Sequence, residues 1–161
     1  MSSATAIGRK TRSKPLQYLI KHGYIPKDCW GLDYGCGRGF DHESMGSKWY
    51  GYDPGQESFK KNPGRYYDII TCTYVLNVVD VWEQADIVNS IAECLAPGGH
   101  AFISVRRDLW RGDDVAPRSG RGCKQRYVEL DLPTLVVNSQ FEIYFGSRNR
   151  LQTEATRLLG A

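Results

Sequence analysis

The hydrophobic pattern of the chain alternates between short apolar runs and one long amphipathic segment. Four runs have the length and character of buried strands: residues 29–34, 49–52, 68–73 and 100–105. Between residues 80 and 95 apolar side chains recur at helical spacing, which predicts a helix that Asp80 caps. The Pro-Gly-Gly sequence at 97–99 ends this helix. A strand, a helix and a strand in this order predict a right-handed parallel crossover and therefore an α/β fold.

Shorter elements are predicted towards the two ends of the chain. Ser13 is a favourable helix cap, and Pro15 fits the first turn of a helix that ends near Gly23. Residues 132–137 predict a brief helix, and the alternation of apolar and polar residues over 141–145 predicts a further strand.

The size and composition of the chain agree with one domain. It has 161 residues, of which 41% are hydrophobic and 24% charged. We expect a basic flexible N-terminus over residues 1–12, a single domain over residues 13–150, and a C-terminal tail over residues 151–161 that could form a helix. No apolar run approaches the length of a membrane span, and no signal peptide is evident. The five cysteines form no C-x-x-C pair, which favours a reducing, cytoplasmic setting.

The strongest functional signal follows the first apolar run, in the sequence Asp33-Tyr34-Gly35-Cys36-Gly37-Arg38-Gly39. Glycines at alternate positions let a backbone turn sharply and approach a ligand closely. An ordinary glycine-rich turn would look the same, but a second acid, Asp53, ends the next apolar run about twenty residues after Asp33. This spacing is expected when a second strand brings a carboxylate to a ribose. The stretch therefore predicts a site for a nucleoside cofactor.

Two details of this stretch argue against a dinucleotide. In the dinucleotide-binding motif a third glycine lets the helix pack closely on the strand, but Phe40 occupies that position here. Asp33 precedes the first glycine, where its charge would repel a pyrophosphate and attract a cation. We therefore expect a cofactor that carries an amino group.

A glycine loop preceded by an acid and followed by a strand ending in Asp53 resembles the class I S-adenosylmethionine-dependent methyltransferases. Residues 67–72 and 95–105 look like the fourth and fifth strand motifs of that family, and the resemblance covers roughly residues 29 to 107. It implies a small Rossmann-like sheet, mostly parallel, with S-adenosylmethionine as the cofactor. The residues that it implies at the cofactor are Asp33, Gly35, Cys36, Gly37, Asp53, Pro54, Thr73 and Tyr74.

The resemblance also implies a role for several of these residues. The backbone of Gly35 and Gly37 would pass close to the methionine part of the cofactor. Asp33 would face the ammonium group of the cofactor. Asp53 would accept hydrogen bonds from the two ribose hydroxyls, an arrangement that suits a carboxylate.

The segment after Asp53 departs from the family. Residues 54–65 are polar and hold turn signals, so they leave no room for the helix and third strand of a full methyltransferase sheet. We predict that the third strand is missing or vestigial. Tyr52, Pro54 and Phe59 are then the candidates for packing on adenine, and aromatic cover for the sheet edge is an alternative explanation. The exposed edge could pair with another chain.

The chemistry of methyl transfer needs few special residues. Displacement at a sulfonium requires alignment more than a strong acid or base. Tyr74 and Asn77 are the candidates for positioning the acceptor, although Tyr74 could equally be a wall of the cofactor pocket. The absence of prolines here disfavours methylation of an exocyclic base amine, and Cys72 fits a core position rather than a nucleophile. The three histidines show no metal spacing, so we predict no metal.

Basic residues cluster over residues 1–14 and 106–126, although the net charge is only +3. Such clusters can contact phosphates, and solvated loops explain them equally well. From the second cluster we select Arg106, Arg107 and Arg121 as candidate substrate contacts.

A closer resemblance agrees with a phosphate-bearing substrate. Ala-Ile-Gly-Arg near the N-terminus, the glycine loop, Gly-Tyr-Asp-Pro and Val-Arg-Arg together resemble methyltransferases associated with DNA phosphorothioation and compact phage relatives. Three functions stay open. The leading one is methylation of a nucleic acid or nucleotide. The others are methylation of a small molecule, and binding of cofactor or nucleic acid without turnover.

Overall fold

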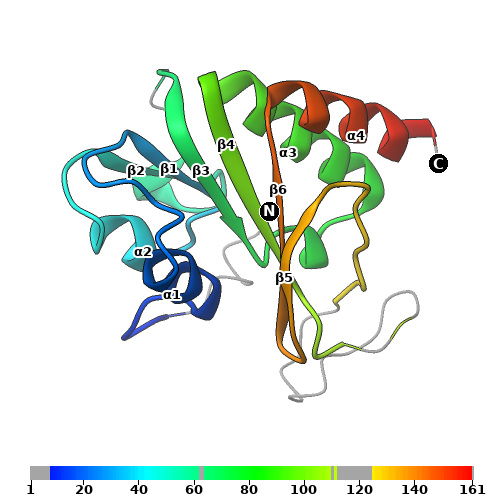
Figure 1. Cartoon of the computed structure of the whole chain (residues 1–161), viewed down its shortest axis with the longest axis horizontal. Helices are drawn as coiled ribbons and strands as arrows, with labels where there is room; N and C mark the ends of the chain where they lie inside the picture. Colours follow the sequence, from blue (N-terminus) through cyan, green and yellow to red (C-terminus); the bar gives the residue numbers. More distant parts are fainter. Residues whose placement is uncertain (1–7, 62–63, 110, 112–124, 161) are drawn as a thin grey trace.

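A six-stranded sheet forms the centre of the protein (Figure 1). The computed structural model describes residues 8–61, 64–109, 111 and 125–160, and the structural statements below concern these residues. In spatial order the strands are β2 (Trp49–Tyr52), β1 (Gly31–Tyr34), β3 (Tyr67–Thr73), β4 (Leu95–Arg106), β6 (Phe141–Gly146) and β5 (Thr134–Val137). The first four are parallel, whereas β6 is antiparallel to β4, and β5 to β6. The predicted α/β fold with a mostly parallel sheet is confirmed.

The strand β2 ends the sheet on one side. Between β2 and β3 the described residues form one short 3₁₀ helix, η2 (Glu57–Phe59), and no strand. The predicted lack of a third strand is therefore confirmed for the part of the chain that the structure describes.

Two long helices pack side by side on one face of the sheet, α3 (Val81–Cys94) and α4 (Arg148–Gly160) (Figure 1). Asp80 caps α3 as predicted, since its carboxylate accepts a hydrogen bond of 2.8 Å from the Glu83 N–H. Alternate residues of the central strands, such as Ile70 and Ile103, point towards α3 and form one apolar core with it. No helix among the described residues combines the length and hydrophobicity needed to cross a bilayer.

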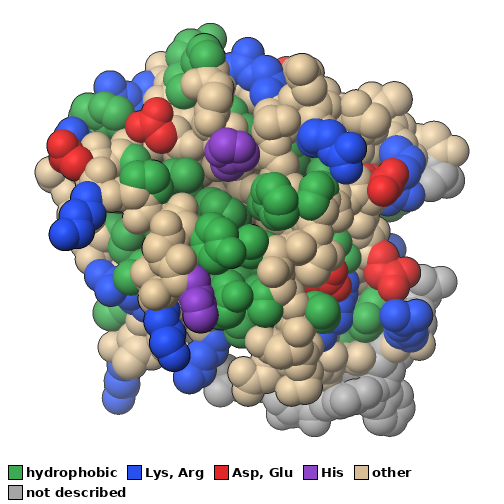
Figure 2. Space-filling model, viewed as in Figure 1, with side chains coloured by type: hydrophobic (Ala, Val, Ile, Leu, Met, Phe, Trp, Pro, Cys, Tyr) green, Lys and Arg blue, Asp and Glu red, His purple; other side chains and the backbone are tan. Residues whose placement is uncertain are grey.

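Shorter helices lie near β1 and β2, namely α1 (Lys14–Lys21) and α2 (Phe40–Glu43) (Figure 1). Ser13 caps α1, and Leu19 of α1 belongs to a second apolar cluster together with Trp49 and Phe102. This cluster is covered less completely, because residues such as Phe145 at its margin are only partly buried. Figure 2 shows hydrophobic side chains reaching the surface in the middle of the molecule in this view.

The predicted helix over residues 132–137 is wrong, because the structure forms strand β5 there. Val136 and Val137 are β-branched and pair with β6, which suits a strand better than a helix. The turn into β6 is closed by Asn138, whose side chain accepts hydrogen bonds from the backbone N–H groups of residues 140 and 141 at 2.8 and 2.9 Å. The spacing of a few apolar residues did not reveal this hairpin.

The C-terminal segment forms the helix α4, which begins at Arg148. Leu151, Ala155 and Leu158 of α4 belong to the same apolar core as α3. The expected boundary at residue 150 thus falls inside α4, and α3 is the packing partner that the sequence did not reveal. Residues 1–7 and 112–124, which include part of the expected flexible N-terminus and of the basic loop, lie outside the described residues.

Replacing Leu151 tests the contribution of α4 to the core. Its side chain is fully buried (0% exposed), so L151A should lower the free energy of unfolding by about 2–5 kcal/mol through lost burial and a cavity. Leu159 on the same helix is 48% exposed, and L159A should change the stability by less than about 0.5 kcal/mol. Urea denaturation measures both variants. Equal small effects would show that α4 contributes little to the core.

Candidate functional site

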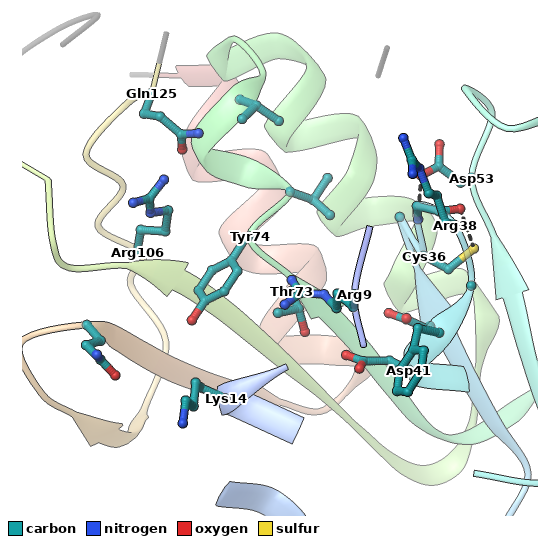
Figure 3. A pocket seen from close by; sticks show the side chains of 18 of the residues that line it. Arg9, Lys14, Cys36, Arg38, Asp41, Asp53, Thr73, Tyr74, Arg106 and Gln125 are labelled. Carbon is teal, nitrogen blue, oxygen red and sulfur yellow. Dashed lines mark hydrogen bonds between the residues drawn. The ribbon is translucent and has the colours of Figure 1, made fainter. Parts of the chain in front are cut away.

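A cleft opens at the carboxyl ends of β1 and β3, where the strand order switches direction. Its volume is about 400 Å³, which is within the usual range for small-molecule sites. Figure 3 shows Tyr74 in the middle of the cleft, with Arg106 and Gln125 to one side and Cys36 and Asp53 to the other. The cleft is therefore built from segments that are far apart in the sequence.

The glycine loop after β1 forms one wall of the cleft. Gly35, Gly37 and Gly39 have φ angles of 80°, 55° and 89°, a region that residues with a Cβ rarely adopt. The Gly35 N–H donates a hydrogen bond of 2.7 Å to the Tyr52 carbonyl, which ties the loop to the end of β2. The loop thus brings backbone, with little side-chain bulk, to the surface of the cleft.

Asp53 lies at the carboxyl end of β2 and is 7% exposed. Its two carboxylate oxygens accept hydrogen bonds from the Gly37 N–H at 2.8 Å and from the Gly55 N–H at 2.9 Å. Each carboxylate oxygen has a further lone pair, so Asp53 can still accept a hydrogen bond on each side. This arrangement suits a ligand with two neighbouring hydroxyl groups.

Asp33 lies deeper, at the end of β1, and is 5% exposed. Burial raises the pKa of its carboxyl group to about 7, and the negative charge of Asp41 adds to the shift. The Thr71 hydroxyl donates a hydrogen bond of 3.3 Å to Asp33, and this contact and the charge of Arg9 lower the pKa in part. A cation in the cleft would favour the ionised form.

Asp41 is a site residue that the sequence did not single out. Asp41 is 8% exposed and lines the cleft from α2. Its carboxylate accepts two hydrogen bonds from Ser13, one of 2.9 Å from the backbone N–H and one of 2.5 Å from the hydroxyl. Next to it, the Arg12 guanidinium donates hydrogen bonds of 2.9 Å to the hydroxyl and carbonyl of Ser44. These contacts hold the chain before α1 against α2, so that Arg9 and Lys14 line the cleft.

The buried carboxylates test whether the site fits the cofactor that the sequence implies. Asp33, Asp41 and Asp53 all line the cleft, and within the described ranges none of them forms an ion pair. Buried carboxylates that no ion pair neutralises favour a ligand with positive charge. The sulfonium and ammonium groups of S-adenosylmethionine supply such charge, and its ribose hydroxyls match Asp53. The residues present therefore fit this cofactor.

Thr73 and Tyr74 extend from the end of β3 into the cleft. Tyr74 has a φ angle of 62°, in the left-handed region, and its N–H donates a hydrogen bond of 2.9 Å to the Ser104 carbonyl. Strained conformations of this kind concentrate at functional sites. Burial raises the pKa of the Tyr74 phenol to about 12, so the hydroxyl is neutral near pH 7 and can donate or accept a hydrogen bond.

The cysteines of the cleft region are poor nucleophiles. Burial, followed by the charges of Asp33 and Asp53, raises the pKa of the Cys36 thiol, and burial likewise raises that of Cys72 inside β3. Both remain neutral thiols near pH 7. Among residues 8–61, 64–109, 111 and 125–160, no cluster of three His, Cys, Asp or Glu side chains could hold a metal ion.

Two of the predicted substrate and catalytic residues do not line the cleft. The Arg107 guanidinium is buried against Glu142 at 2.8 Å and donates a hydrogen bond of 2.9 Å to the Tyr144 hydroxyl. Asn77 is fully buried. Its amide oxygen accepts a hydrogen bond of 2.9 Å from the Arg106 N–H, and its amide nitrogen donates one of 2.7 Å to the Arg126 carbonyl. The Arg107 side chain thus connects the end of β4 to β6, and the Asn77 side chain connects Arg106 to Arg126. Both stabilise the fold around the cleft without lining it.

Of the other predicted residues, some line the cleft and some lie outside it. Arg106 lines the cleft and pairs with Asp108, with one hydrogen bond of 2.8 Å. Pro54 is exposed outside the cleft, and neither Tyr52 nor Phe59 lines it. Arg121 lies outside the described residues. Besides Asp41, sequence reasoning missed the following residues that line the cleft: Arg9, Lys14, Arg38, Gln125 and Gln140. The basic N-terminal cluster was the only signal for the first two.

Solved structures of methyltransferases share this fold. A TehB-like S-adenosylmethionine-dependent methyltransferase from Corynebacterium glutamicum is 16% identical, with a TM-score of 0.55 over 82% of this chain and 86% of that one. The 1,6-didemethyltoxoflavin-N1-methyltransferase of Burkholderia thailandensis, with bound 1,6-didemethyltoxoflavin and S-adenosylhomocysteine, is 16% identical, with a TM-score of 0.58 over 82% and 76%. The magnesium protoporphyrin IX methyltransferase of Synechocystis, with bound S-adenosylhomocysteine, is 15% identical, with a TM-score of 0.53 over 81% and 78%.

The sequence itself gives the family. No curated protein matches it. A protein-family model for the methyltransferase domain matches residues 11–142, which span the glycine loop, both acidic strand ends and the whole parallel sheet. The chain therefore belongs to the methyltransferase domain family and is an S-adenosylmethionine-dependent methyltransferase.

Proposed function

We propose that the enzyme transfers a methyl group to a small acceptor that carries a phosphate or carboxylate group. The observation that carries this proposal is the position of Lys14. It lines the cleft as an exposed residue at the start of α1, and its side chain forms no ion pair or hydrogen bond in the described part of the chain. Figure 3 shows Lys14 near Tyr74, on the side of the cleft away from Asp53. An unpaired cation there favours an anionic acceptor.

The opposite side of the cleft suits the cofactor. Asp53 would accept hydrogen bonds from the ribose hydroxyls, and Asp33 would face the ammonium group. Arg9 is close enough to Asp33 to lower the pKa of its carboxyl group, so it would face the carboxylate next to that ammonium. Asp33 and Arg9 would thus provide one negative and one positive charge for the ammonium and carboxylate groups of the cofactor. The bound cofactor supplies the electrophilic methyl group.

Tyr74 would position the acceptor between these two halves. Its φ angle of 62° and its hydrogen bond to the Ser104 carbonyl hold the side chain at the centre of the cleft. Because the phenol stays neutral near pH 7, it would orient the acceptor through a hydrogen bond rather than remove a proton. Alignment of this kind is the main requirement of a direct displacement.

The arginines at the end of β4 and directly after it favour a small acceptor over a nucleic acid polymer. In the described part of this basic segment, Arg106 pairs with Asp108, Arg107 with Glu142 and Arg111 with Glu129. The charges of Arg106 and Arg107 are therefore balanced within the protein, whereas Arg111 and Glu129 form an exposed surface pair. The toxoflavin and porphyrin enzymes of the same fold also act on small molecules, so a nucleotide remains the largest acceptor that we propose.

A turnover assay with labelled cofactor tests the proposal. Nucleoside monophosphates, aromatic carboxylic acids, and single-stranded DNA and RNA oligonucleotides serve as separate acceptor pools. We expect turnover with at least one of the small anionic pools, and K14A should raise the KM for that acceptor about tenfold, the value of one charge-assisted contact. Lys27 is exposed outside the cleft, and K27A is the control. Turnover restricted to oligonucleotides, with a steep dependence on salt, would contradict the proposal.

Replacing Asp53 tests the placement of the cofactor. D53N keeps one oxygen acceptor but removes the charge, so S-adenosylmethionine should bind roughly 10- to 100-fold more weakly. Glu57 is an exposed acid close by in the sequence, and E57Q should bind the cofactor normally. Isothermal titration measures both variants, and thermal melting shows whether they fold. Wild-type affinity in folded D53N would rule out the ribose contact.

The pKa of Asp33 predicts how cofactor binding depends on pH. The carboxyl group has a pKa of about 7 in the free protein and is therefore largely protonated at pH 5. The ammonium group of the cofactor favours the ionised form, so protons compete with the cofactor below pH 7. Between pH 7 and pH 5 the Kd should rise by roughly tenfold per unit.

The variant D33N isolates this effect. Its Kd should be higher than that of the wild type at pH 7 and nearly constant down to pH 5. The measurements stop at pH 7 because free α-amino groups lose their proton near pH 8. An equal pH slope in D33N and in the wild type would assign the titration to another group.

A further inference from the structure

The geometry points to Gln125 as the residue that selects the acceptor, by accepting a hydrogen bond from an N–H or O–H group of the acceptor. This inference rests on the proposed function, because it concerns the same half of the cleft. It narrows the acceptor to a molecule that presents a hydrogen-bond donor beside its reacting atom, together with the anionic group that faces Lys14.

The side-chain oxygen of Gln125 is an unsatisfied acceptor. The residue lines the cleft and is only 7% exposed. Its Oε1 atom is buried and has no hydrogen-bond partner among the residues that the structure describes. Buried polar atoms are nearly always paired, and an unpaired one destabilises the protein that carries it. A ligand that donates a hydrogen bond to Oε1 would remove this cost.

The other buried polar atoms that lack a hydrogen-bond partner in the described residues do not face the cleft. Two further buried atoms have no partner, the His42 Nδ1 and the Tyr67 hydroxyl. His42 packs edge-on against Phe59 with ring centroids 4.9 Å apart, and Tyr67 begins β3 at the other end of the sheet. Neither lines the cleft. The position of Gln125 among the lining residues therefore sets it apart from these two.

The backbone next to Gln125 is held firmly in place. The Arg126 N–H donates a hydrogen bond of 2.7 Å to the Asn77 carbonyl, and the Arg126 carbonyl accepts one of 2.7 Å from the Asn77 amide. The oxygen of the same amide accepts a hydrogen bond of 2.9 Å from the Arg106 N–H. Asn77 thus joins the chain after Gln125 to the end of β4 and acts as a positioning residue for this wall.

The surroundings of Gln125 define the chemistry of the acceptor. Figure 3 shows Gln125 and Arg106 on the same side of Tyr74. Val75 and Val78 add apolar surface to the cleft. A flat molecule with an amino or ring N–H group would meet apolar contacts from the valines, a hydrogen bond at Gln125 and a cation at Lys14. Adenine nucleotides and aminobenzoates have this combination of groups.

The first test needs no ligand. Q125M replaces the amide with an apolar side chain of similar length, so it removes the unsatisfied acceptor. The melting temperature of the free protein should rise by about 2–4 °C. Gln152 is exposed on α4, and Q152M should leave the melting temperature unchanged. A fall in the melting temperature of Q125M would show that the Gln125 amide has a structural partner, and would overturn the inference.

The second test uses two pairs of probes that differ in one amino group. Adenosine 5′-monophosphate is compared with purine riboside 5′-monophosphate, and anthranilate with benzoate, by titration into enzyme loaded with S-adenosylhomocysteine. In at least one pair the wild type should bind the amino compound about tenfold more tightly, a difference of one hydrogen bond. In Q125M the two members of that pair should bind within about twofold of each other, while Q152M keeps the tenfold preference.

The outcomes separate this inference from the proposed function. K14A should weaken both members of a pair equally, because it removes the contact to the anionic group that they share. If the wild type does not distinguish the members of either pair while K14A weakens both, the assignment of Gln125 is wrong and the anionic acceptor stands. If K14A has no effect, or if no probe binds at millimolar concentration, the anionic acceptor is wrong. Preference in the wild type that persists in Q125M also overturns the assignment.

Discussion

The arrangement of the cleft depends on the hydrogen bonds between the end of β2 and the glycine loop. The Tyr52 carbonyl accepts hydrogen bonds from the first two N–H groups of the loop, and the Asp53 carboxylate accepts one from Gly37. Among the described strands β2 pairs only with β1, so no third strand there fixes its carboxyl end. The same contacts therefore hold an edge strand in place and shape one wall of the cleft. Because of these hydrogen bonds, the sheet that the structure describes can hold the glycine loop in place although it lacks a third strand beside β2.

The contact between Ser13 and Asp41 extends the site beyond the sheet. Ser13 caps α1 by accepting a hydrogen bond from the Leu16 N–H, and it donates its hydroxyl to Asp41 on α2. The start of α1 and the wall of the cleft thus share one buried carboxylate. Because α2 follows directly on the glycine loop, the chain before α1 is fixed relative to that loop. This explains how residues near the N-terminus reach a cleft that the glycine loop and β3 define.

Much of the fold could be predicted from the sequence, because strands and helices with strong periodicity leave local signals. The parallel order, the cap at Asp80 and the missing strand after Asp53 all follow from patterns within a few residues. β5 could not, because a four-residue edge strand is decided by its pairing with β6 rather than by its own pattern. At the site, the glycine loop and the two acids had recognisable spacing. Asp41 and the buried Arg107 side chain bond partners more than twenty residues away, and the chain next to Gln125 is held by the contact of Arg126 with Asn77. No local pattern specifies contacts of this kind.

The span of the cleft along the chain has a consequence for folding. Its walls come from segments as distant as Arg9 and Gln140, and the contact between Asn77 and Arg126 closes a loop of almost fifty residues, with the two positions 49 apart. Closing loops of this length costs chain entropy, and proteins rich in such contacts fold more slowly than proteins rich in local contacts. A chain in which only β1 and β2 had paired would still lack the wall that holds Gln125. Ligand binding would then occur only in molecules that have finished folding, so newly made chains would remain inactive until their C-terminal half has docked.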